Sequence, residues 1–393
     1  MSDKQMRRIV IVGGGLAGHR AAGALRRQGF DGEVTVIGDE EHRPYDRPPL
    51  SKQILAGEMK DDAAYFDCDG IDVDWRLGQP AKGLDLEQRV IHLAHGDDVP
   101  YDGLVIATGR RAREWPEPIE LSRIYTLRSL DDCRALRDAV RPGCKVVIVG
   151  AGFIGCEVAA TLRRREIADI TVVDVADQPM VPLGEEAGER AADVHRKHGV
   201  NLRLGSGVER FEGGDRVEAV LFKEGDRLDA DVVLLALGAQ PNSEWLEDSG
   251  LKLFKGTVCC DEHLFAIGQE NVVAAGDIAS FPHPELDDPI WVEHWTNARD
   301  MASAAAKNLI AAREDRKPFR AVPTFWSDQY DLKIKSAGFV GLADRFEIVE
   351  DEPQRPALVV EAYRGDDLVG AVTFNRNRAM IEYTRRLAGM VAA

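Results

Sequence analysis

The sequence predicts an α/β fold in which one supersecondary unit occurs twice. In each copy an apolar, β-branched run meets a glycine-rich turn, and a helical stretch and a second strand follow. The turns are residues 13–18 and 150–155, and each copy is later closed by a strand that ends in glycine, at Gly109 and at Gly238. A single glycine pattern is weak evidence for a dinucleotide-binding fold, but recurrence of the whole unit is strong evidence. We therefore expect two Rossmann-like, three-layer dinucleotide-binding domains.

In the first copy the spacing predicts a strand over residues 9–12, a helix over 19–27 and a strand over 30–37. Gly13 permits a tight turn, Gly15 lets the backbone approach a pyrophosphate, and Gly18 lets the helix pack on the strand. The phosphates then lie at the positive end of the helix dipole. The expected contact residues of this turn are Gly13, Gly15, Leu16, Ala17 and Gly18.

Two later segments are expected to complete the first copy. Residues 104–109 form its closing strand, and residues 271–275 form another strand that leads into Gly276 and Asp277. A carboxylate at a strand end, beside a helix start, suits hydrogen bonding to a polyol chain, although Asp277 could also be a simple helix N-cap. This arrangement makes the first domain discontinuous, with the second domain inserted into it. The expected contact residues here are Ala107, Thr108, Gly109, Gly276 and Asp277.

The second copy repeats the same order. It predicts a strand over residues 145–149, a helix over 156–165 and a strand over 170–173 that ends in Asp174. The expected contact residues of this copy are Gly150, Gly152, Phe153, Ile154, Gly155, Asp174 and Gly238.

Composition excludes several classes of partner. The formal net charge of −17 argues against nucleic acid and anionic membranes, which both favour a basic surface. No apolar run approaches the roughly 18 residues that a membrane span needs, and glycines interrupt the run that follows Arg7 and Arg8. The six cysteines show no pairing pattern of the secreted kind. We expect a cytoplasmic protein with reduced thiols.

A family resemblance becomes visible at residues 45–52, Tyr-Asp-Arg-Pro-Pro-Leu-Ser-Lys. This run resembles the signature of the FAD-dependent ferredoxin reductases of bacterial oxygenase systems, such as the putidaredoxin, rubredoxin and aromatic-dioxygenase ferredoxin reductases. Further matching runs are residues 107–109, 155–157, 275–277, 293–295 and 325–329. The resemblance implies an FAD-binding domain (1–112 and 240–320), an NADH-binding domain (113–239) and a smaller C-terminal α/β interface domain (321–393).

The resemblance also implies that Lys52 and Glu157 form a pair near the reactive ring nitrogen of the flavin. A fixed ammonium there stabilises the anionic reduced ring and tunes its potential. The alternatives are that Lys52 is a solvated surface charge and that Glu157 is a first-turn helix acid favoured by the helix dipole.

Other residues in the matching runs are candidates for cofactor contacts. Arg47 is expected to neutralise pyrophosphate or flavin-side charge, and Trp295 and Trp326 to lie against the flavin unless they are core residues. Gly38 stands where related sequences often carry an acid, so the FAD ribose contact is open between Asp39 and Glu40. The remaining candidates from these runs are Glu293 and His294.

Asp174 predicts a preference for NADH over NADPH. It follows Gly155 by about 20 residues, where a carboxylate can accept hydrogen bonds from the adenosine ribose. The next residues add Asp177 and no base, so a phosphorylated ribose would meet repulsion. The alternative is that Asp174 only ends a strand.

The chain contains no Cys-x-x-Cys or Cys-x4-Cys pair and no Cys or His cluster with metal-ligand spacing. Electrons taken as hydride from NADH by the flavin must therefore leave singly to an external acceptor. By the resemblance, this is a two-iron–two-sulfur ferredoxin, or a rubredoxin, that feeds an oxygenase. The alternatives are a small-molecule acceptor (quinone, ascorbyl radical or oxygen) and a redox-linked binding protein similar to apoptosis-inducing factor.

An acidic ferredoxin requires a local basic patch on this acidic protein, because long-range repulsion must be overcome at the docking face. Three groups are candidates. They are Arg110, Arg111 and Arg113; Lys333 and Lys335; and Arg376 and Arg378. The alternative for each group is that its residues are ordinary solvated surface charges.

Overall fold

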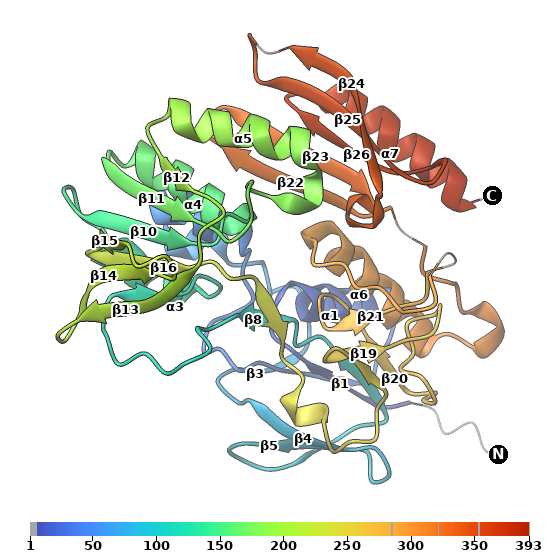
Figure 1. The fold of residues 1–393 in the computed structure, drawn as a ribbon. Coiled ribbons are helices and arrows are strands. Elements are labelled where there is room, and N and C mark those ends of the chain that lie inside the picture. The colour runs from blue at the N-terminus through green and yellow to red at the C-terminus, as the bar shows by residue number, and fades with distance from the viewer. Residues whose placement is uncertain (1–5, 284–285, 321, 353, 393) are drawn as a thin grey trace. The chain divides into compact units, whose positions relative to one another are not determined.

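The computed structural model describes residues 6–283, 286–320, 322–352 and 354–392 (Figure 1). They form two compact units. The first unit comprises Met1–Asp46, Tyr65–Arg111 and Gln240–Pro323, and the second comprises Arg47–Ala64, Ala112–Ala239 and Thr324–Ala393. Residue 321, where the predicted interface domain begins, lies outside the described residues.

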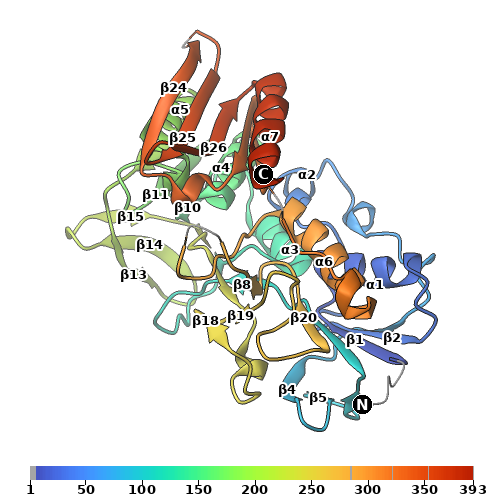
Figure 2. The same ribbon diagram turned by 90° about the vertical axis from the view of Figure 1, so that its right-hand side faces the viewer.

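The first unit is built on a parallel five-stranded sheet with the strand order β20-β7-β1-β2-β3. Every residue of β7 and β20 is buried, as is typical of parallel strands that are covered on both faces. The helices α1 and α6 pack against each other, and Figure 2 shows them side by side. The bounds are β1 Arg8–Val12, β2 Glu33–Ile37, β3 Asp74–Arg76, β7 Gly103–Ile106, β20 Val272–Ala274, α1 Leu16–Arg27 and α6 Trp295–Ile310.

Two small sheets complete the first unit. One is antiparallel, with the order β4-β5-β6, and the other has the order β18-β19-β21. Their bounds are β4 Ala81–Asp85, β5 Val90–Leu93, β6 Val99–Pro100, β18 Leu253–Phe254, β19 Thr257–Cys259 and β21 Ala279–Ser280. The remaining short elements near this unit are η4 Glu244–Leu246, η5 Arg313–Asp315, β8 Arg110–Ala112 and β17 Ala239–Pro241.

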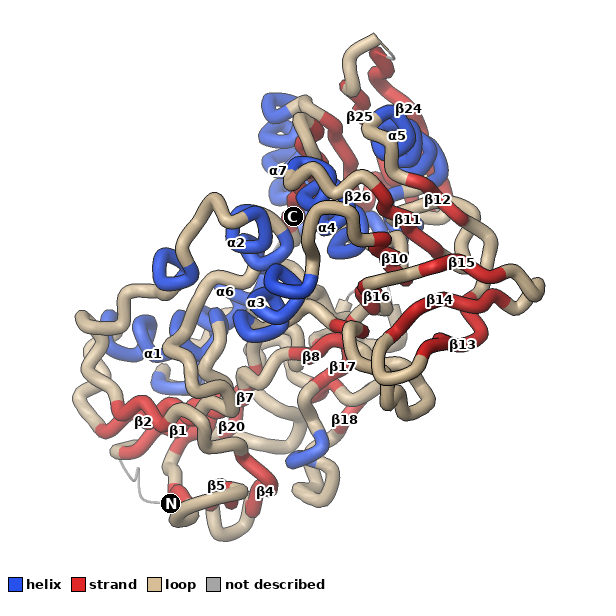
Figure 3. Tube along the Cα trace, turned by 90° about the vertical axis from the view of Figure 1, so that its left-hand side faces the viewer, coloured by secondary structure: helices blue, strands red, loops and turns tan. Residues whose placement is uncertain are grey.

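The second unit repeats the parallel arrangement, with the strand order β12-β11-β10-β16-β9. Figure 3 shows this sheet together with the antiparallel ribbon β13-β14-β15. The strands are β9 Ile124–Tyr125, β10 Lys145–Val149, β11 Asp169–Val173, β12 Asn201–Arg203, β13 Val208–Gly213, β14 Val217–Phe222, β15 Arg227–Asp229 and β16 Val232–Leu235. The helices are α3 Leu130–Ala139, α4 Phe153–Arg164, η3 Val181–Leu183 and α5 Glu185–Lys197.

A second sheet in this unit is antiparallel, with the order β22-β23-β26-β25-β24, and α7 packs on it. Its residues Ile334 and Val360 share one buried cluster with Ala187 and Ala191 of α5. The predicted α/β character of the C-terminal residues is thus confirmed, and their sheet shares a buried cluster with α5. The bounds are β22 Thr324–Gln329, β23 Leu332–Gly338, η6 Val340–Leu342, β24 Arg345–Glu352, β25 Ala357–Arg364, β26 Asp367–Phe374 and α7 Asn377–Ala392.

Residues 47–64 are held to helices of the second unit by polar contacts. Asp61 accepts from the guanidinium groups of Arg134 and Arg137 of α3, each at 2.8 Å. Thr161 of α4 donates its hydroxyl to the carbonyl oxygen of Ser51 at 2.8 Å. The segment contains the short helices η1 Pro48–Ser51, α2 Gln53–Ala56 and η2 Asp61–Ala64.

The helices after the glycine turns begin earlier than predicted. They start at Leu16 and Phe153, three residues before the predicted starts at 19 and 156. The reason is that the last glycine of each turn, Gly18 or Gly155, is already helical and packs on the turn itself. The strand predicted from residue 30 begins at Glu33, because both backbone polar groups of Phe30 are bonded to the end of α1, its amide to the oxygen of Leu25 and its oxygen to the guanidinium of Arg26.

Among the described residues, no helix is both long and apolar enough to cross a membrane.

Candidate cofactor and electron-transfer site

Gly13, Gly15 and Gly18 of the first turn have three different structural requirements. Gly13 has a φ of +123°, and a Cβ there would lie 2.1 Å from the carbonyl oxygen of Ala107. A Cβ on Gly18 would lie 1.9 Å from the carbonyl oxygen of Gly13, whereas a Cβ on Gly15 would meet nothing within 4 Å. Gly15 is the N-cap of α1 and provides no side-chain cap. The N-terminus of α1 therefore opens onto free space at Gly15, beside the first backbone N–H groups of the helix, which have no acceptor within it, and this fits the pyrophosphate of FAD.

The structure brings the other predicted residues of the first copy to the same turn. The amide of Ala107 donates to the carbonyl oxygen of Val12 at 2.7 Å. Gly276 has a φ of +79°, and a Cβ there would lie 3.2 Å from the Cβ of Ala17. Thr108 exchanges two hydrogen bonds with Asn242, a residue that the sequence analysis did not identify. Ala107 and Thr108 thus lie against the first turn and Gly276 lies against α1, as a dinucleotide site requires.

Gly38 explains why no acid directly follows β2. A Cβ on Gly38 would lie 3.3 Å from a methyl group of Leu77 and 3.4 Å from the Cα of Gly14, so a side chain there would be crowded. Of the two candidate acids, Glu40 accepts from the hydroxyl of Tyr45 at 2.5 Å, and Asp39 is exposed. The ribose contact stays a prediction for either residue.

The second turn has the same geometry. Gly150 has a φ of +114°, and a Cβ there would lie 2.3 Å from the carbonyl oxygen of Ala236. A Cβ on Gly155 would lie 2.0 Å from the carbonyl oxygen of Gly150, while Gly152, the N-cap of α4, faces open space. A second pyrophosphate therefore fits at this helix start.

Asp174 is held at the second turn by two backbone donors. Its Oδ2 accepts from the amide of Ala151 at 2.6 Å, and its Oδ1 accepts from the amide of Ala176 at 2.9 Å. Each carboxylate oxygen keeps a second lone pair that can accept from a ribose hydroxyl. The residue therefore does more than end a strand, since it fixes the turn and still presents acceptors beside it.

Two neighbouring residues of the second turn differ in environment. The side chain of Ile154 is exposed, whereas the ring of Phe153 packs on Phe325 with 4.1 Å between centroids. Gly238 has a φ of +85° after the closing strand β16.

Lys52 and Glu157 form a buried ion pair within the second unit. The Nζ of Lys52 lies 2.6 Å from the Oε2 of Glu157, and only 8% and 4% of the two side chains are exposed. Lys52 follows η1, whose residues Pro48 and Pro49 restrict φ and stiffen the segment. Neither member of the pair is a solvated surface charge.

Two hydroxyl groups complete the surroundings of the Glu157 carboxylate. Ser51 donates to Oε2 at 2.5 Å, and Ser327 donates to Oε1 at 2.6 Å. A buried carboxylate needs such partners, since an ion without them would be strongly destabilising. The sequence analysis did not identify either serine as a site residue, although both lie in runs that carry the family resemblance.

The predicted residues at the start of α6 are brought together in the first unit. Trp295 donates its indole N–H to the carboxylate of Asp46 at 2.7 Å. Glu293 forms an ion pair with Arg110 at 3.1 Å. His294 is the N-cap of α6, and burial lowers its pKa to about 4, so the imidazole is neutral at pH 7.

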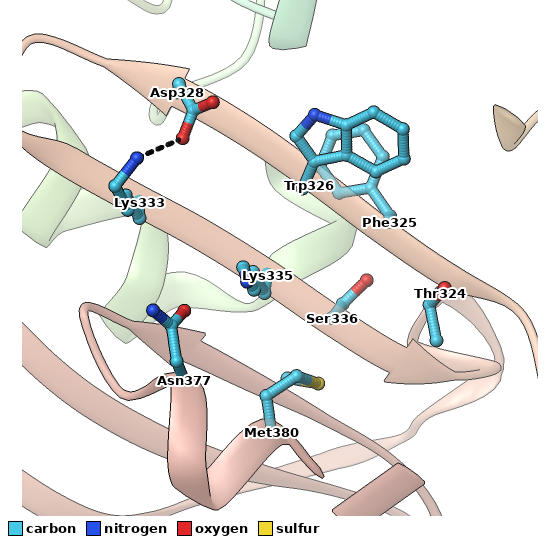
Figure 4. Close-up of a pocket in the computed structure, with 9 residues that line it drawn as sticks. All are labelled: Thr324, Phe325, Trp326, Asp328, Lys333, Lys335, Ser336, Asn377 and Met380. Carbon is cyan, nitrogen blue, oxygen red and sulfur yellow. Dashed lines mark hydrogen bonds and ion pairs between the residues drawn. The ribbon is translucent and has the colours of Figure 1, made fainter. Parts of the chain in front are cut away.

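Arg47 and Trp326 belong to the second unit. Arg47 donates to the carbonyl oxygen of Arg128 at 2.6 Å. Trp326 lies on β22 and lines a pocket with Phe325, Lys333 and Lys335 (Figure 4). Trp295 and Trp326 are both partly exposed, so neither is a core residue.

Comparison with known proteins gives the family. Residues 7–302 match the pyridine nucleotide-disulphide oxidoreductases. The chain belongs to this family. Residues 324–391 match a family described as reductase C-terminal, which corresponds to the antiparallel sheet and α7.

Individual relatives agree with this assignment. Rhodocoxin reductase from Rhodococcus erythropolis is 35% identical over 379 residues, which cover 94% of this chain and 87% of that protein. The ferredoxin–NAD(+) reductase component of the biphenyl dioxygenase system of Paraburkholderia xenovorans is 37% identical over 335 residues, covering 84% and 80%. A chain in the crystal structure of the covalent putidaredoxin reductase–putidaredoxin complex is 29% identical and superimposes with a TM-score of 0.89. The match covers 97% of this chain and 93% of that chain.

These matches confirm the predicted resemblance to ferredoxin reductases of bacterial oxygenase systems. They also confirm an oxidoreductase of the FAD- and NADH-dependent type, with two dinucleotide-binding parts and a C-terminal part.

Proposed function

We propose that this oxidoreductase takes hydride from NADH onto FAD and passes single electrons to a two-iron–two-sulfur ferredoxin, or a rubredoxin, that feeds an oxygenase in the cytoplasm. The observation that carries the proposal is the pair of glycine turns, each opening onto free space at a helix N-terminus. The relatives named above are reductases of such electron-transfer systems. All six cysteines are free, in keeping with a reducing compartment.

The chain's own residues would bind and orient the cofactors. Bound FAD would accept two electrons from NADH and release them one at a time. The start of α1 would hold the FAD pyrophosphate and Asp277 its polyol chain, while Asp174 would hold the NADH ribose. Lys52, kept in place by Glu157, would supply a fixed positive charge for the flavin ring. Under this proposal residues 1–112 and 240–320 bind FAD, 113–239 bind NADH, and 321–393 form the interface domain.

Anaerobic reduction of the yellow protein tests the proposal directly. NADH is expected to bleach the flavin absorbance rapidly and NADPH slowly. Reduction of cytochrome c by NADH is expected to require an added ferredoxin. Fast bleaching with no effect of any ferredoxin would favour a small-molecule acceptor. Slow bleaching with a long-lived charge-transfer complex would favour a binding protein similar to apoptosis-inducing factor.

Replacing Asp174 with asparagine is expected to relax the preference for NADH. The change removes the negative charge that opposes a 2′-phosphate, while the side-chain oxygen can still accept from one backbone N–H. We expect the ratio of kcat/KM for NADH to that for NADPH to fall about tenfold, or about 1.4 kcal/mol. The exposed Asp193 of α5 provides a matched control, since D193N makes the same charge change away from the turn. An equal shift in both variants would contradict the assigned role of Asp174.

The three candidate basic groups for ferredoxin docking differ in their exposure and in their acidic partners. Arg110 is paired with Glu293 and Arg111 with Glu244, and Arg376 is paired with both Glu350 and Glu352. Lys333 is exposed and lies 3.4 Å from a single carboxylate, that of Asp328, and Arg378 is likewise exposed, 3.3 Å from the carboxylate of Glu382.

Lys333 and Lys335 also share a pocket of about 430 Å³ with Trp326, Asn377 and Met380 (Figure 4). Two lysines beside a partly exposed indole provide both charge and apolar contact area for an acidic protein surface. Of the three groups, this one supports docking best.

Reversing both lysine charges (K333E with K335E) is expected to raise the KM for an acidic ferredoxin about tenfold at low ionic strength. The effect should shrink as salt is added, because exposed charges are screened. The control is K197E with K223E, which makes the same total charge change at two exposed lysines of the second unit. Steady-state cytochrome c reduction at several salt concentrations measures both variants. The docking assignment is wrong if the two double variants behave alike.

A further inference from the structure

A chain of hydrogen bonds continues beyond the Glu157 carboxylate and has no place in the function described so far. Ser327 accepts from the amide nitrogen of Gln329 at 3.1 Å. The side-chain oxygen of Gln329 lies 2.9 Å from Nε2 of His195, and Nδ1 of His195 lies 3.2 Å from the hydroxyl of Tyr330. We call Tyr330, His195, Gln329 and Ser327 the donor chain.

The donor chain has a definite direction. An ionised carboxylate only accepts, so the Ser327 hydroxyl must donate to it and can then accept from the Gln329 amide N–H. The oxygen of Gln329 is then the atom that faces His195. Nε2 must therefore be protonated, and when the imidazole is neutral Nδ1 accepts from Tyr330 and every donor points toward Glu157.

Burial makes this direction hard to change. Ser327, Gln329 and His195 are at most 1% exposed, so water does not offer them alternative partners. Burial is also the largest cause that lowers the pKa of His195 to about 4; the hydrogen bond to Gln329 opposes this shift, and the nearby His198 adds to it. The imidazole is therefore neutral at pH 7, and Nδ1 accepts from Tyr330.

The far end of the donor chain is fixed by an unusual backbone conformation. Tyr330 has a φ of +55° in the tight connection between β22 and β23, a region that bulky residues rarely adopt. Its ring stacks on His198 with 3.7 Å between centroids, and its hydroxyl reaches His195. Such a conformation persists only where the surrounding contacts enforce it.

We propose that the donor chain positions Glu157, and through it Lys52, for the reduction of the flavin by NADH. Ser327, Gln329 and His195 are positioning residues, since they act through the carboxylate rather than on a cofactor. The chain links α5, through His195, and β22, through Gln329 and Ser327, to the ion pair on α4 and the Lys52 segment. This role in the reaction rests on the proposed function, whereas the proton arrangement does not.

The proton arrangement is tested on the protein as purified, without any turnover. Nitrogen-15 labelling of histidine, with His195→Gln to assign the signal, is expected to show a neutral His195 protonated at Nε2 between pH 5.5 and 8. The titratable groups beside it are His198, the C-cap residue of α5, and Tyr330 of the β22–β23 connection. A His195 that is protonated at Nδ1, or charged in this range, would overturn the proposal.

The positioning role is tested by a pair of variants at His195. His195→Leu removes the donor to Gln329, whereas His195→Gln keeps an N–H donor and an acceptor in one side chain. In stopped-flow reduction by NADH, we expect the limiting rate of His195→Leu to fall about tenfold, because misplaced groups lose rate rather than binding. The apparent Kd for NADH should be unchanged, and His195→Gln should recover most of the rate.

Gln329→Met is the second variant, in case His195→Leu does not fold. It is similar in length and is also expected to lower the limiting rate without changing the Kd. Equal loss in His195→Leu and His195→Gln, or a change confined to the Kd, would overturn the positioning role. If NADH fails to reduce the wild-type flavin, the proposed function fails while the imidazole result still stands, so the two failures can be told apart.

Discussion

Replacing Lys52 with methionine is expected to lower the free energy of unfolding by about 3–5 kcal/mol, because it leaves the carboxylate of Glu157 buried without its cation. The hydroxyl groups of Ser51 and Ser327 still donate to the carboxylate, but neither supplies a compensating charge. Urea denaturation followed by circular dichroism measures the loss. The rate of flavin reduction by NADH should fall as well, since the fixed ammonium is gone.

A double-mutant cycle separates these two effects. Glu157→Gln alone leaves the ammonium of Lys52 buried and unpaired, whereas the combined variant K52M/E157Q carries no buried charge. We expect the combined variant to be more stable than the sum of the single losses predicts, by about 3 kcal/mol. Its flavin reduction should stay as slow as that of Lys52→Met. Additive stability losses, or restored reduction in the double variant, would contradict the roles assigned to the pair.

The glycines of the first turn provide the second prediction. Gly18→Ala is expected to destabilise the protein by about 3 kcal/mol, since the added Cβ would lie 1.9 Å from the backbone oxygen of Gly13. Gly15→Ala meets nothing within 4 Å, so its stability should stay within about 1 kcal/mol of the wild type. Its methyl group would instead occupy the space that the pyrophosphate needs, weakening FAD binding about 10- to 100-fold. Thermal unfolding and the flavin-to-protein absorbance ratio measure the two quantities.

Gly152→Ala is the matched control in the second turn, where a Cβ also meets nothing within 4 Å. This variant should keep its flavin and show a raised Kd for NADH. If Gly15→Ala retains FAD as tightly as the wild type, or if Gly152→Ala loses it, the assignment of the two turns is wrong.

The sequence by itself determined the two glycine turns, the strands around them and the family resemblance. These features depend on patterns of a few neighbouring residues, such as a β-branched run that meets glycine, and each pattern has a local physical cause. Such local patterns did not predict the residues at which the two helices begin. Whether Gly18 and Gly155 precede or belong to the helix depends on how closely the helix packs on its own turn.

Only the tertiary structure decided which polar groups act together. The tertiary fold joins residues that are far apart in the sequence into one buried hydrogen-bonded system, namely Ser51, Glu157, His195 and Ser327. The same holds for surface charge, because Arg110 and Lys333 look alike as sequence signals, yet Arg110 is buried and paired while Lys333 is exposed. Local residue patterns determine conformation over a few residues, whereas the partner of a buried charge depends on packing between segments that no local pattern relates.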